Sequence, residues 1–599
     1  MPGVCGVISR LGASAADVQA MTGILSRQPW HSATHEVGAQ FAFGHVSVQG
    51  SSSARTSAVV SRGPCTAVFD GELYGHETAG REDHARVFLD GVLDRGPEFL
   101  RTIHGCFSAA LWNGELGTLT LITDRFGLRP VFWRRAQERF SFASEVGALL
   151  AGSAPEALSQ QGIAEFLSFG QLLGDSTLYE TVKAAPAAAW IVFDTRAGTL
   201  DVRQYASWTA STASQPQSYW VDAVDAALAA SVERVSRRSD HLGLSLSGGL
   251  DARTVLGVLP SGVSATCVSL GIPGSIDLRA ARAMAEATSQ KFVAHALNGD
   301  FLGQFEPLLR QMVALSDGHY LDQGIVLTTL PLYRSLGIDA LLRGHAGELM
   351  HMSKAYAFSV DDDALRLRNR QELIDWLWTH LTGYMIGGVD PGLFSTEMSA
   401  DIRDRARAAL ERCVDALPEA PATQRIWHLF VTERVRREIA ASLQVFRSFV
   451  EVRVPFLDPA LVQLLLDAPV EMKIGATLQS EILQRRCPPL LRIVNANTGA
   501  PMTAGPQRQR LSSLSMRVLA KLGVPGYQPY ERLGLWLARD LHPFLRATLL
   551  DERFLDRRIF DRAAVERLLD EHRERRKNHT YLLQALLVFE LGQRLRDSA

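Results

Sequence analysis

Two patterns of hydrophobic and polar residues divide the chain. Up to about residue 205, short apolar runs alternate with Gly and polar turns, which is typical of β-strands. The clearest runs are FAFGHVSVQ (41–49), CTAVFDGELY (65–74), GTLTLITD (117–124) and WIVFD (190–194). We expect them to form a strand-rich N-terminal domain.

The pattern changes after the Ser- and Thr-rich stretch 209–218. Helical periodicity over 219–235 leads into LGLSLS (242–247), a short apolar strand, and a second helix is expected from about residues 251–254. A further strand (265–271) and helix (278–289) follow. Alternating strands and helices predict parallel βαβ units. Beyond residue 360 the chain is expected to be mostly helical.

The length of 599 residues exceeds one ordinary hydrophobic core. We therefore expect a domain at 1–208, a linker at 209–218 and a second domain at 219–599. The fold class is predicted as α/β, with a parallel sheet flanked by helices in the second domain.

Composition narrows the classes of function. The net charge of −2 leaves no basic footprint for nucleic acid. The six cysteines include no CxxC pair, which argues against a zinc site and a disulfide framework. No run of about 18 apolar residues suggests a membrane span. We expect a cytoplasmic protein without nucleic-acid or membrane partners.

The strongest chemical signal is LSLSGGLDAR (244–253). A strand ends in Ser247-Gly248-Gly249, and a helix begins near Asp251. Glycines let the backbone approach an anion, and the N–H groups of a helix N-terminus favour phosphate. Asp251 would repel phosphate unless it holds a divalent cation, so we expect an ATP-binding loop with a Mg²⁺ ligand.

This loop resembles the pyrophosphate loop of ATP-pyrophosphatases and differs from the Walker loop. TLITDRFGLRPVFW (120–133), FSFASEVGALL (140–150) and VEVRVPFLD (450–458) are similar to elements of the asparagine synthetase superfamily. The resemblance implies an N-terminal Ntn-hydrolase-like αββα sandwich, a degenerate glutaminase, followed by an ATP-pyrophosphatase domain.

The resemblance also implies site residues. RGHAGELM (343–350) stands where the superfamily has GxGxDE, so Asp251 and Glu348 are the expected Mg²⁺ ligands, and His345 is expected either as a base or as a packed loop histidine. His345, Asp251 and Glu348 are the catalytic candidates. The expected ATP-contacting residues are Leu246, Ser247, Gly248, Gly249, Leu250, Asp251, Gly271 and Gly344.

One departure concerns a lysine. The superfamily has a Lys about two dozen residues after PFLD, where this chain has Gln479 or Ser480. Lys473, Arg485 and Arg486 are alternative cations, and the sequence does not decide among them.

A second departure concerns Cys5. In glutamine-dependent members the nucleophile is an N-terminal cysteine whose own α-amine is the base, but here Val4 precedes Cys5. FGHVSVQ (43–49) lacks the Arg of the family's GHxRL element. Where the family has a second element, NGE, this chain has Asp70-Gly71-Glu72. We expect Cys5 to be a small buried side chain, and no glutaminase activity.

GIPGSIDLRAAR (271–282) and NANTGAPM (495–502) are similar to lasso peptide cyclases within the superfamily. The resemblance implies adenylation of an Asp or Glu side chain of a ribosomal precursor peptide, the leaderless core, and attack by the peptide's N-terminal amine. A leader peptidase and a leader-recognition protein are the implied partners.

Other functions stay open. They are a β-lactam synthetase-like small-ring cyclase, an ammonia-dependent asparagine synthetase and a non-catalytic peptide-binding chaperone.

Overall fold

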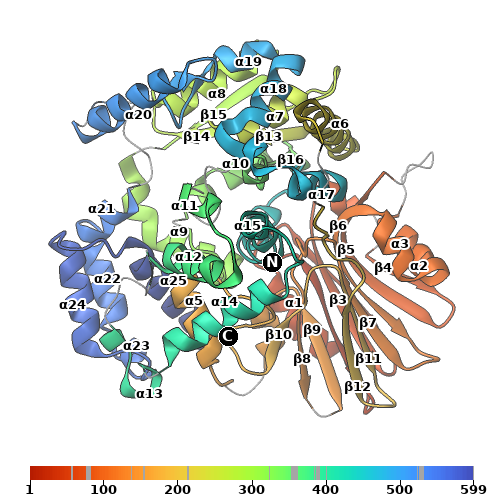
Figure 1. Cartoon of the computed structure of the whole chain (residues 1–599). Coiled ribbons are helices and arrows are strands. Elements are labelled where there is room, and N and C mark those ends of the chain that lie inside the picture. The colour runs from red at the N-terminus through yellow and green to blue at the C-terminus, as the bar shows by residue number, and fades with distance from the viewer. Residues whose placement is uncertain are drawn as a thin grey trace.

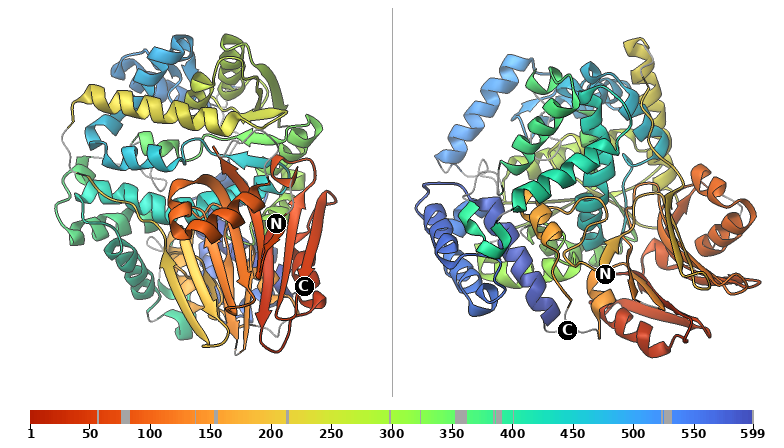
Figure 2. Two further views of the ribbon diagram at one scale, coloured as in Figure 1. Left: turned by 90° about the vertical axis from the view of Figure 1, so that its right-hand side faces the viewer. Right: turned by 60° about the horizontal axis from the view of Figure 1, so that its bottom comes forward.

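The computed structural model describes residues 1–55, 58–75, 83–136, 138–152, 156–211, 215–297, 299–322, 324–351, 362–383, 385, 391–399, 401–522, 524 and 532–597. An N-terminal β-sandwich, red to yellow in Figure 1, packs against a C-terminal part that contains a parallel sheet and most of the helices. The left view of Figure 2 shows the sandwich from the side that faces right in Figure 1.

The sandwich consists of two antiparallel sheets. In spatial order the first contains β10 (Val182–Ala184), β8 (Phe132–Ala136), β9 (Arg139–Ala143), β1 (Gly3–Ser9), β3 (Phe41–Val48) and β2 (His31–Val37). The second contains β12 (Thr199–Gln204), β11 (Ala189–Asp194), β7 (Thr118–Thr123), β6 (His104–Asn113), β5 (Cys65–Tyr74) and β4 (Val59–Arg62). The apolar runs identified in the sequence are therefore strands.

Alternate side chains of β1 belong to two different hydrophobic cores, which shows how the sheets and helices of this domain are layered. Val4 and Ile8 join the core between the two sheets, while Cys5 and Val7 join the core under α1 (Ala15–Leu25). Successive side chains of a strand point to opposite faces, so one strand serves both layers. Helices α2 (His84–Arg95) and α3 (Pro97–Thr102) cover the second sheet. The expected αββα sandwich is confirmed.

The second sheet system is parallel, as expected. Its spatial order is β15 (Lys291–Ala296), β14 (Thr266–Gly271), β13 (Leu242–Ser245), β16 (Ala340–Leu342) and β17 (Glu451–Arg453). The flanking helices include α6 (Gln217–Ser236), α7 (Asp251–Val258), α8 (Ile276–Ala287), α10 (Leu330–Ser335), α16 (Ala440–Arg447), α17 (Pro459–Asp467) and α18 (Thr477–Arg486). The strand order reverses between β13 and β16, which is where open α/β sheets bind ligands.

A helical lobe completes the molecule. It contains α5 (Gln160–Phe169), α9 (Phe305–Leu315), α12 (Arg370–Thr382), α14 (Ile402–Asp415), α21 (Leu533–Ala538), α22 (His542–Leu549), α24 (Arg562–Arg573) and α25 (Thr580–Asp597). Much of its core is continuous with the core beneath the first sheet of the sandwich. Among the described helices, none combines the length and apolar character needed to cross a bilayer.

The expected linker is only partly described, because residues 212–214 lie outside the described ranges. The backbone N–H of Ser211 donates to Asp467 of α17 (2.9 Å), and α6 already begins at Gln217. The boundaries proposed from the sequence stay a prediction.

Buried ion pairs join the two domains. Asp70 and Glu72 of β5 meet Arg129 (Nη1–Oδ2 2.5 Å) and Arg453 of β17 (Nε–Oε2 2.7 Å), respectively. The other end of Arg129 meets Glu451 of β17 at 2.7 Å. All five side chains are buried, so each charge depends on its partner.

Candidate active site

A cavity of about 490 Å³ opens at the carboxyl ends of β13, β14 and β16. It is lined by Ser245, Leu246, Ser247, Gly249, Leu250, Asp251, Ala252, Val268, Ser269, Leu270, Asp277, Val326, Thr329, Tyr333, Arg343, Gly344, His345, Glu348, Phe446 and Asn497. The segments that follow β13, β14 and β16 are far apart in sequence and meet here, because parallel strands present their carboxyl ends at one edge.

The Ser247–Asp251 loop forms one wall of the cavity. Helix α7 begins at Asp251, so its unpaired N–H groups lie at this wall. Gly248 is tightly packed, because a Cβ there would lie 2.5 Å from Cβ of Ala496. The N–H of Gly248 donates to Asp277 (3.3 Å). The uncapped N–H groups at the start of α7 suit the binding of a phosphate.

Asp251 and Glu348 face the same cavity as a carboxylate pair. Burial, and then the charge of Asp251, raises the pKa of Glu348 to about 7. Its Oε2 is buried and accepts no hydrogen bond from the described residues. An orphaned carboxylate oxygen beside a second carboxylate fits a divalent cation.

The partners of Asp251 leave room for that cation. Nε2 of Gln479 donates to Oδ1 of Asp251 at 2.9 Å, and Nε2 of His351 lies 3.2 Å from the same oxygen. Both contacts are made to Oδ1, so neither of them occupies Oδ2. Among the described residues no group of three or more His, Cys, Asp or Glu is arranged as a metal centre. Two carboxylates, together with phosphate and water oxygens, would match the coordination that Mg²⁺ prefers in proteins.

Close packing holds this pair. A Cβ on Gly347 would lie 2.3 Å from Cγ of Asp251, and a Cβ on Gly344 would lie 2.8 Å from the backbone N of Ala252. Ala346, between them, has a φ of +63°. The loop after β16 therefore presses its backbone onto the start of α7, and only glycine fits at position 347.

His345 lines the cavity, but its hydrogen bonding is specific. Nε of Arg343 donates to Nδ1 of His345 at 3.1 Å, so the remaining proton lies on Nε2. Burial and the charges of Arg343 and Arg434 hold the pKa of His345 well below its usual value. His345 is thus a neutral ring that presents a donor, and the base role expected of it stays a prediction.

Most, but not all, of the other residues expected to contact ATP line the cavity. Leu246, Ser247, Gly249, Leu250 and Gly344 line the cavity. Gly248 lies just behind it, and Gly271 does not line it, because Leu278 and Ser275 pack over Gly271.

The residues considered in connection with the missing lysine lie in different surroundings. Gln479 contacts Asp251, whereas Arg485 and Arg486 pair with Asp222 and Asp225 of α6. Lys473 is fully buried, with Nζ 5.3 Å from the ring centre of Trp427, and burial lowers its pKa to about 7. Its amine has no hydrogen-bond partner among the described residues.

Several contributors escaped the sequence analysis. His351, Asp277, Arg343 and Asn497 border the cavity or its carboxylates, yet none was singled out from the sequence. Asp277, Arg343 and Asn497 belong to the segments 271–282, 343–350 and 495–502, and His351 directly follows the second of these, so membership of those segments was the available signal.

Cys5 lies in the first sheet of the sandwich and does not line this cavity. It pairs with Gly44 and Ala143 inside the first sheet and is completely buried, as expected. Burial raises the pKa of its thiol to about 12, so no thiolate forms near neutral pH. Its nitrogen is the peptide nitrogen that follows Val4.

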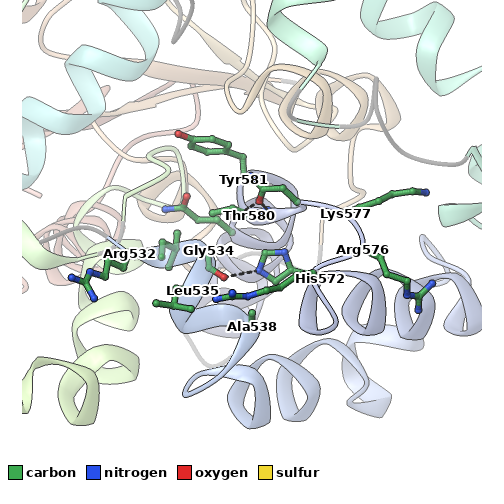
Figure 3. A pocket seen from close by; sticks show the side chains of 13 residues that line it. Arg532, Gly534, Leu535, Ala538, His572, Arg576, Lys577, Thr580 and Tyr581 are labelled. Carbon is green, nitrogen blue, oxygen red and sulfur yellow. Dashed lines mark hydrogen bonds between the residues drawn. The ribbon is translucent and has the colours of Figure 1, made fainter. Parts of the chain in front are cut away.

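A second hollow of about 630 Å³ lies in the helical lobe between α21, α24 and α25 (Figure 3). Its lining is basic, with Arg532, Arg575, Arg576 and Lys577. Several of its polar groups have partners within the chain: His572 bonds the carbonyl of Gly534 (3.0 Å), and Arg576 pairs with Glu574 (2.6 Å). The cavity at β13 is the candidate active site, because it combines the Ser247–Asp251 loop with the Asp251–Glu348 pair.

Comparisons with known proteins agree with this architecture. Residues 1–206 match the glutamine amidotransferase domain family, and residues 223–490 match the asparagine synthase family.

Curated relatives are similar over a limited region. Asparagine synthetase [glutamine-hydrolyzing] 2 of Bacillus subtilis is 25% identical over 219 residues, covering 32% of this chain and 29% of that protein. Asparagine synthetase [glutamine-hydrolyzing] 3 of B. subtilis is 24% identical over 212 residues (32% and 33%). The chain thus matches about a third of the length of these relatives.

Solved structures add little. A glutamine phosphoribosylpyrophosphate amidotransferase from B. subtilis, complexed with ADP and GMP, covers 50% of this chain and 67% of its own with 10% identity and a TM-score of 0.25. A similarity this low defines no common architecture. The tandem family matches, on the sandwich and the parallel-sheet part described above, place the chain in the asparagine synthetase superfamily.

Proposed function

We propose that the protein is an ATP-dependent carbon–nitrogen ligase that releases AMP. One contrast carries the proposal: the phosphate loop and the Asp251–Glu348 pair face an open cavity, while Cys5 is sealed inside a sheet. A ligase that cannot take ammonia from glutamine must take its amine from elsewhere.

The finer proposal is a macrolactam synthetase acting on a ribosomal peptide, which yields a lasso peptide. It is supported by the segments 271–282 and 495–502, which resemble lasso peptide cyclases. Asn497 of the second segment lines the cavity. A substrate that brings its own amine also suits a chain without a usable glutaminase nucleophile.

Binding of ATP is proposed at the Ser247–Asp251 loop, whose N–H groups would bond the phosphates. Oδ2 of Asp251 and Oε2 of Glu348 would hold Mg²⁺, which when bound supplies positive charge that offsets the charge on the phosphates. Gln479 and His351 would keep Asp251 oriented through Oδ1.

The proposed reaction has two steps. A carboxylate oxygen of a substrate Asp or Glu bonds to the α-phosphorus of ATP, the bond to the bridging oxygen breaks, and pyrophosphate leaves. The peptide's N-terminal amine then bonds to the acyl carbon, loses a proton, and AMP leaves with the former carboxylate oxygen. Proximity favours closure, because both groups belong to one chain.

The decisive experiment incubates the purified protein with Mg-ATP and a leaderless core peptide from the neighbouring reading frame. We expect a product lighter by one water, with one AMP per product, by mass spectrometry. Carboxypeptidase resistance would add the threaded shape. Asparagine formed from aspartate, ammonia and ATP, without a peptide product, would instead favour an ammonia-dependent asparagine synthetase. A small ring closed in a free amino-acid derivative would favour a β-lactam synthetase-like cyclase.

Asp251→Ala separates ligases from a peptide-binding chaperone. A ligase loses AMP formation in this variant, while a chaperone keeps its peptide affinity and never formed AMP. Glu306→Gln, in an exposed pair with Arg310, is the control for a lost carboxylate. The leader peptidase and the leader-recognition protein remain proposed partners, and co-purification with either would support them.

A further inference from the structure

Helix α20 (Pro506–Lys521) carries an apolar stripe that faces solvent. Leu511, Leu514, Val518 and Leu522 are 69%, 60%, 48% and 73% exposed. Their spacing of three, four and four residues keeps them within an arc of about 80° at about 100° per residue. Few other large apolar side chains of the described chain are so exposed, and no others form such a row.

The opposite side of α20 attaches it to the body. Oγ of Ser513 donates to the carbonyl of Thr498 at 3.3 Å, and Sδ of Met516 lies 2.1 Å from the position a Cβ on Gly499 would take. Figures 1 and 2 show α20 at the margin of the molecule. The stripe therefore points away from the protein's own core.

Positive charge borders the stripe. Arg508 lies on one side, and Arg510, Arg517 and Lys521 lie on the other, by their helical positions. Residues 506–522 contain no Asp or Glu. None of these four cations has an ion-pair partner among the described residues. A chain with a net charge of −2 thus concentrates unpaired positive charge around one apolar row.

We propose that α20 docks an amphipathic helix of a partner protein whose apolar seam is flanked by acidic residues. A stripe this narrow matches the seam of two packed helices, which is narrower than the apolar face of an ordinary surface helix. Cations at the borders select acidic residues at the matching borders of the partner. The helix has no aromatic residue of the kind that anchors interfacial helices in lipid.

The position of α20 connects this surface to the cavity. The helix packs on the hairpin formed by β18 (Val494–Asn495) and β19 (Ala500–Pro501). Asn497 in that hairpin lines the candidate active site. The N–H of Ala496 also donates to the carbonyl of Gly248 in the phosphate loop (3.0 Å). A docked partner would lie one hairpin away from the phosphate loop.

The test uses the full chain and a fluorescent three-heptad peptide with Leu at its seam and Glu at its borders. We expect the Glu peptide to bind, and a matched peptide with Lys in place of Glu to bind at least about tenfold more weakly. Leu514→Glu with Val518→Glu should weaken binding of the Glu peptide by at least about tenfold. Arg517→Gln with Lys521→Gln should weaken it and reduce its salt dependence.

Leu116→Glu is the matched control, because Leu116 is also 60% exposed but lies in the sandwich. Unchanged melting of all variants confirms that the fold is intact. The proposal is overturned if the Glu and Lys peptides bind equally, if Leu116→Glu weakens binding as much, or if the Glu peptide does not bind. Two further results would overturn it, both with peptide binding unchanged in the stripe variants. In one, the variants no longer bind phosphatidylglycerol vesicles that the wild type binds; in the other, they lose a dimer that the wild type forms in sedimentation.

Discussion

The carboxylate of Glu72 receives two hydrogen bonds from the guanidinium of Arg453, at 2.7 and 2.8 Å, across the boundary between the two domains. Ser52 adds a third, at 2.6 Å. Arg453 is the last residue of the edge strand β17, and its carbonyl accepts from the N–H of Arg343, which lines the cavity. The Asp70-Gly71-Glu72 element, which resembles part of a glutamine pocket, here braces the sheet that carries the active site.

Glu72→Gln should destabilise the protein by about 3 kcal/mol or more at pH 7, because it leaves the buried charge of Arg453 uncompensated. Burial opposes ionisation of Glu72, yet Arg453 lowers its pKa from 4.5 to about 2. The folded pKa lies below the unfolded one, so the stabilisation is present above pH 4.5 and is lost as the pH falls towards 2. Wild type should lose about 1 kcal/mol of it by pH 4 and about 3 kcal/mol by pH 2.

Denaturant unfolding of both proteins from pH 7 to pH 4 measures this change. The difference between wild type and Glu72→Gln should narrow on acidification. Glu98→Gln removes an exposed partner of Arg101 and should cost less than about 1 kcal/mol at any of these pH values. A difference that stays constant with pH would contradict the assigned ion pair.

Gly347→Ala should impair nucleotide chemistry without unfolding the protein. The new methyl group would overlap the carboxylate of Asp251, which must then move from its present position. We expect ATP-dependent AMP formation to fall by at least about tenfold, equivalent to about 1.4 kcal/mol. Gly23→Ala is the matched control, because nothing lies within 4 Å of a Cβ there and the residue is inside α1. Equal activity of the two variants would show that Asp251 does not need its present orientation.

Gln479→Leu should raise the KM for Mg-ATP more than it lowers kcat. The substitution removes the donor to Oδ1 of Asp251 while nearly conserving volume. A hydrogen bond to a charged group contributes about 1.5–3 kcal/mol, so an effect of about tenfold or more is expected. Gln463→Leu, which removes a half-buried amide bonded to Asp467 within α17, is the control and should leave both constants unchanged. An unaltered KM in Gln479→Leu would exclude this orienting role.

Cys5→Ala should leave ATP-dependent product formation intact and cost about 1 kcal/mol of stability, as for a small core truncation. Glutamine incubated with either protein should release no glutamate, because the thiol is protonated and sealed in β1. An enzyme-coupled glutamate assay checks this. Glutamate release by wild type that disappears in Cys5→Ala would restore the glutaminase hypothesis.

The local pattern of apolar and polar residues was sufficient to predict several strands and helices. Alternation along 41–49 and 65–74 predicted β3 and β5, and helical spacing in 219–235 predicted α6, because burial of one face imposes a period on the sequence. The phosphate loop was also predictable, since Gly-Gly between a strand and a helix has a local conformational cause. Glu348 and Asp251 were found through motifs, although they are 97 positions apart.

Tertiary structure decided what distant residues share. Nothing local in the sequence indicates that Gln479, rather than Ser480, Lys473 or the two arginines, contacts Asp251. Nothing local indicates that Glu72 meets Arg453, 381 residues later. The sequence by itself determined the strands, the helices and the chemistry of one loop, because these depend on short-range periodicity and backbone freedom. Only the fold decided which charges are paired, which carboxylate oxygens stay free and which apolar face of α20 remains uncovered, because those outcomes depend on burial among segments that meet only in space.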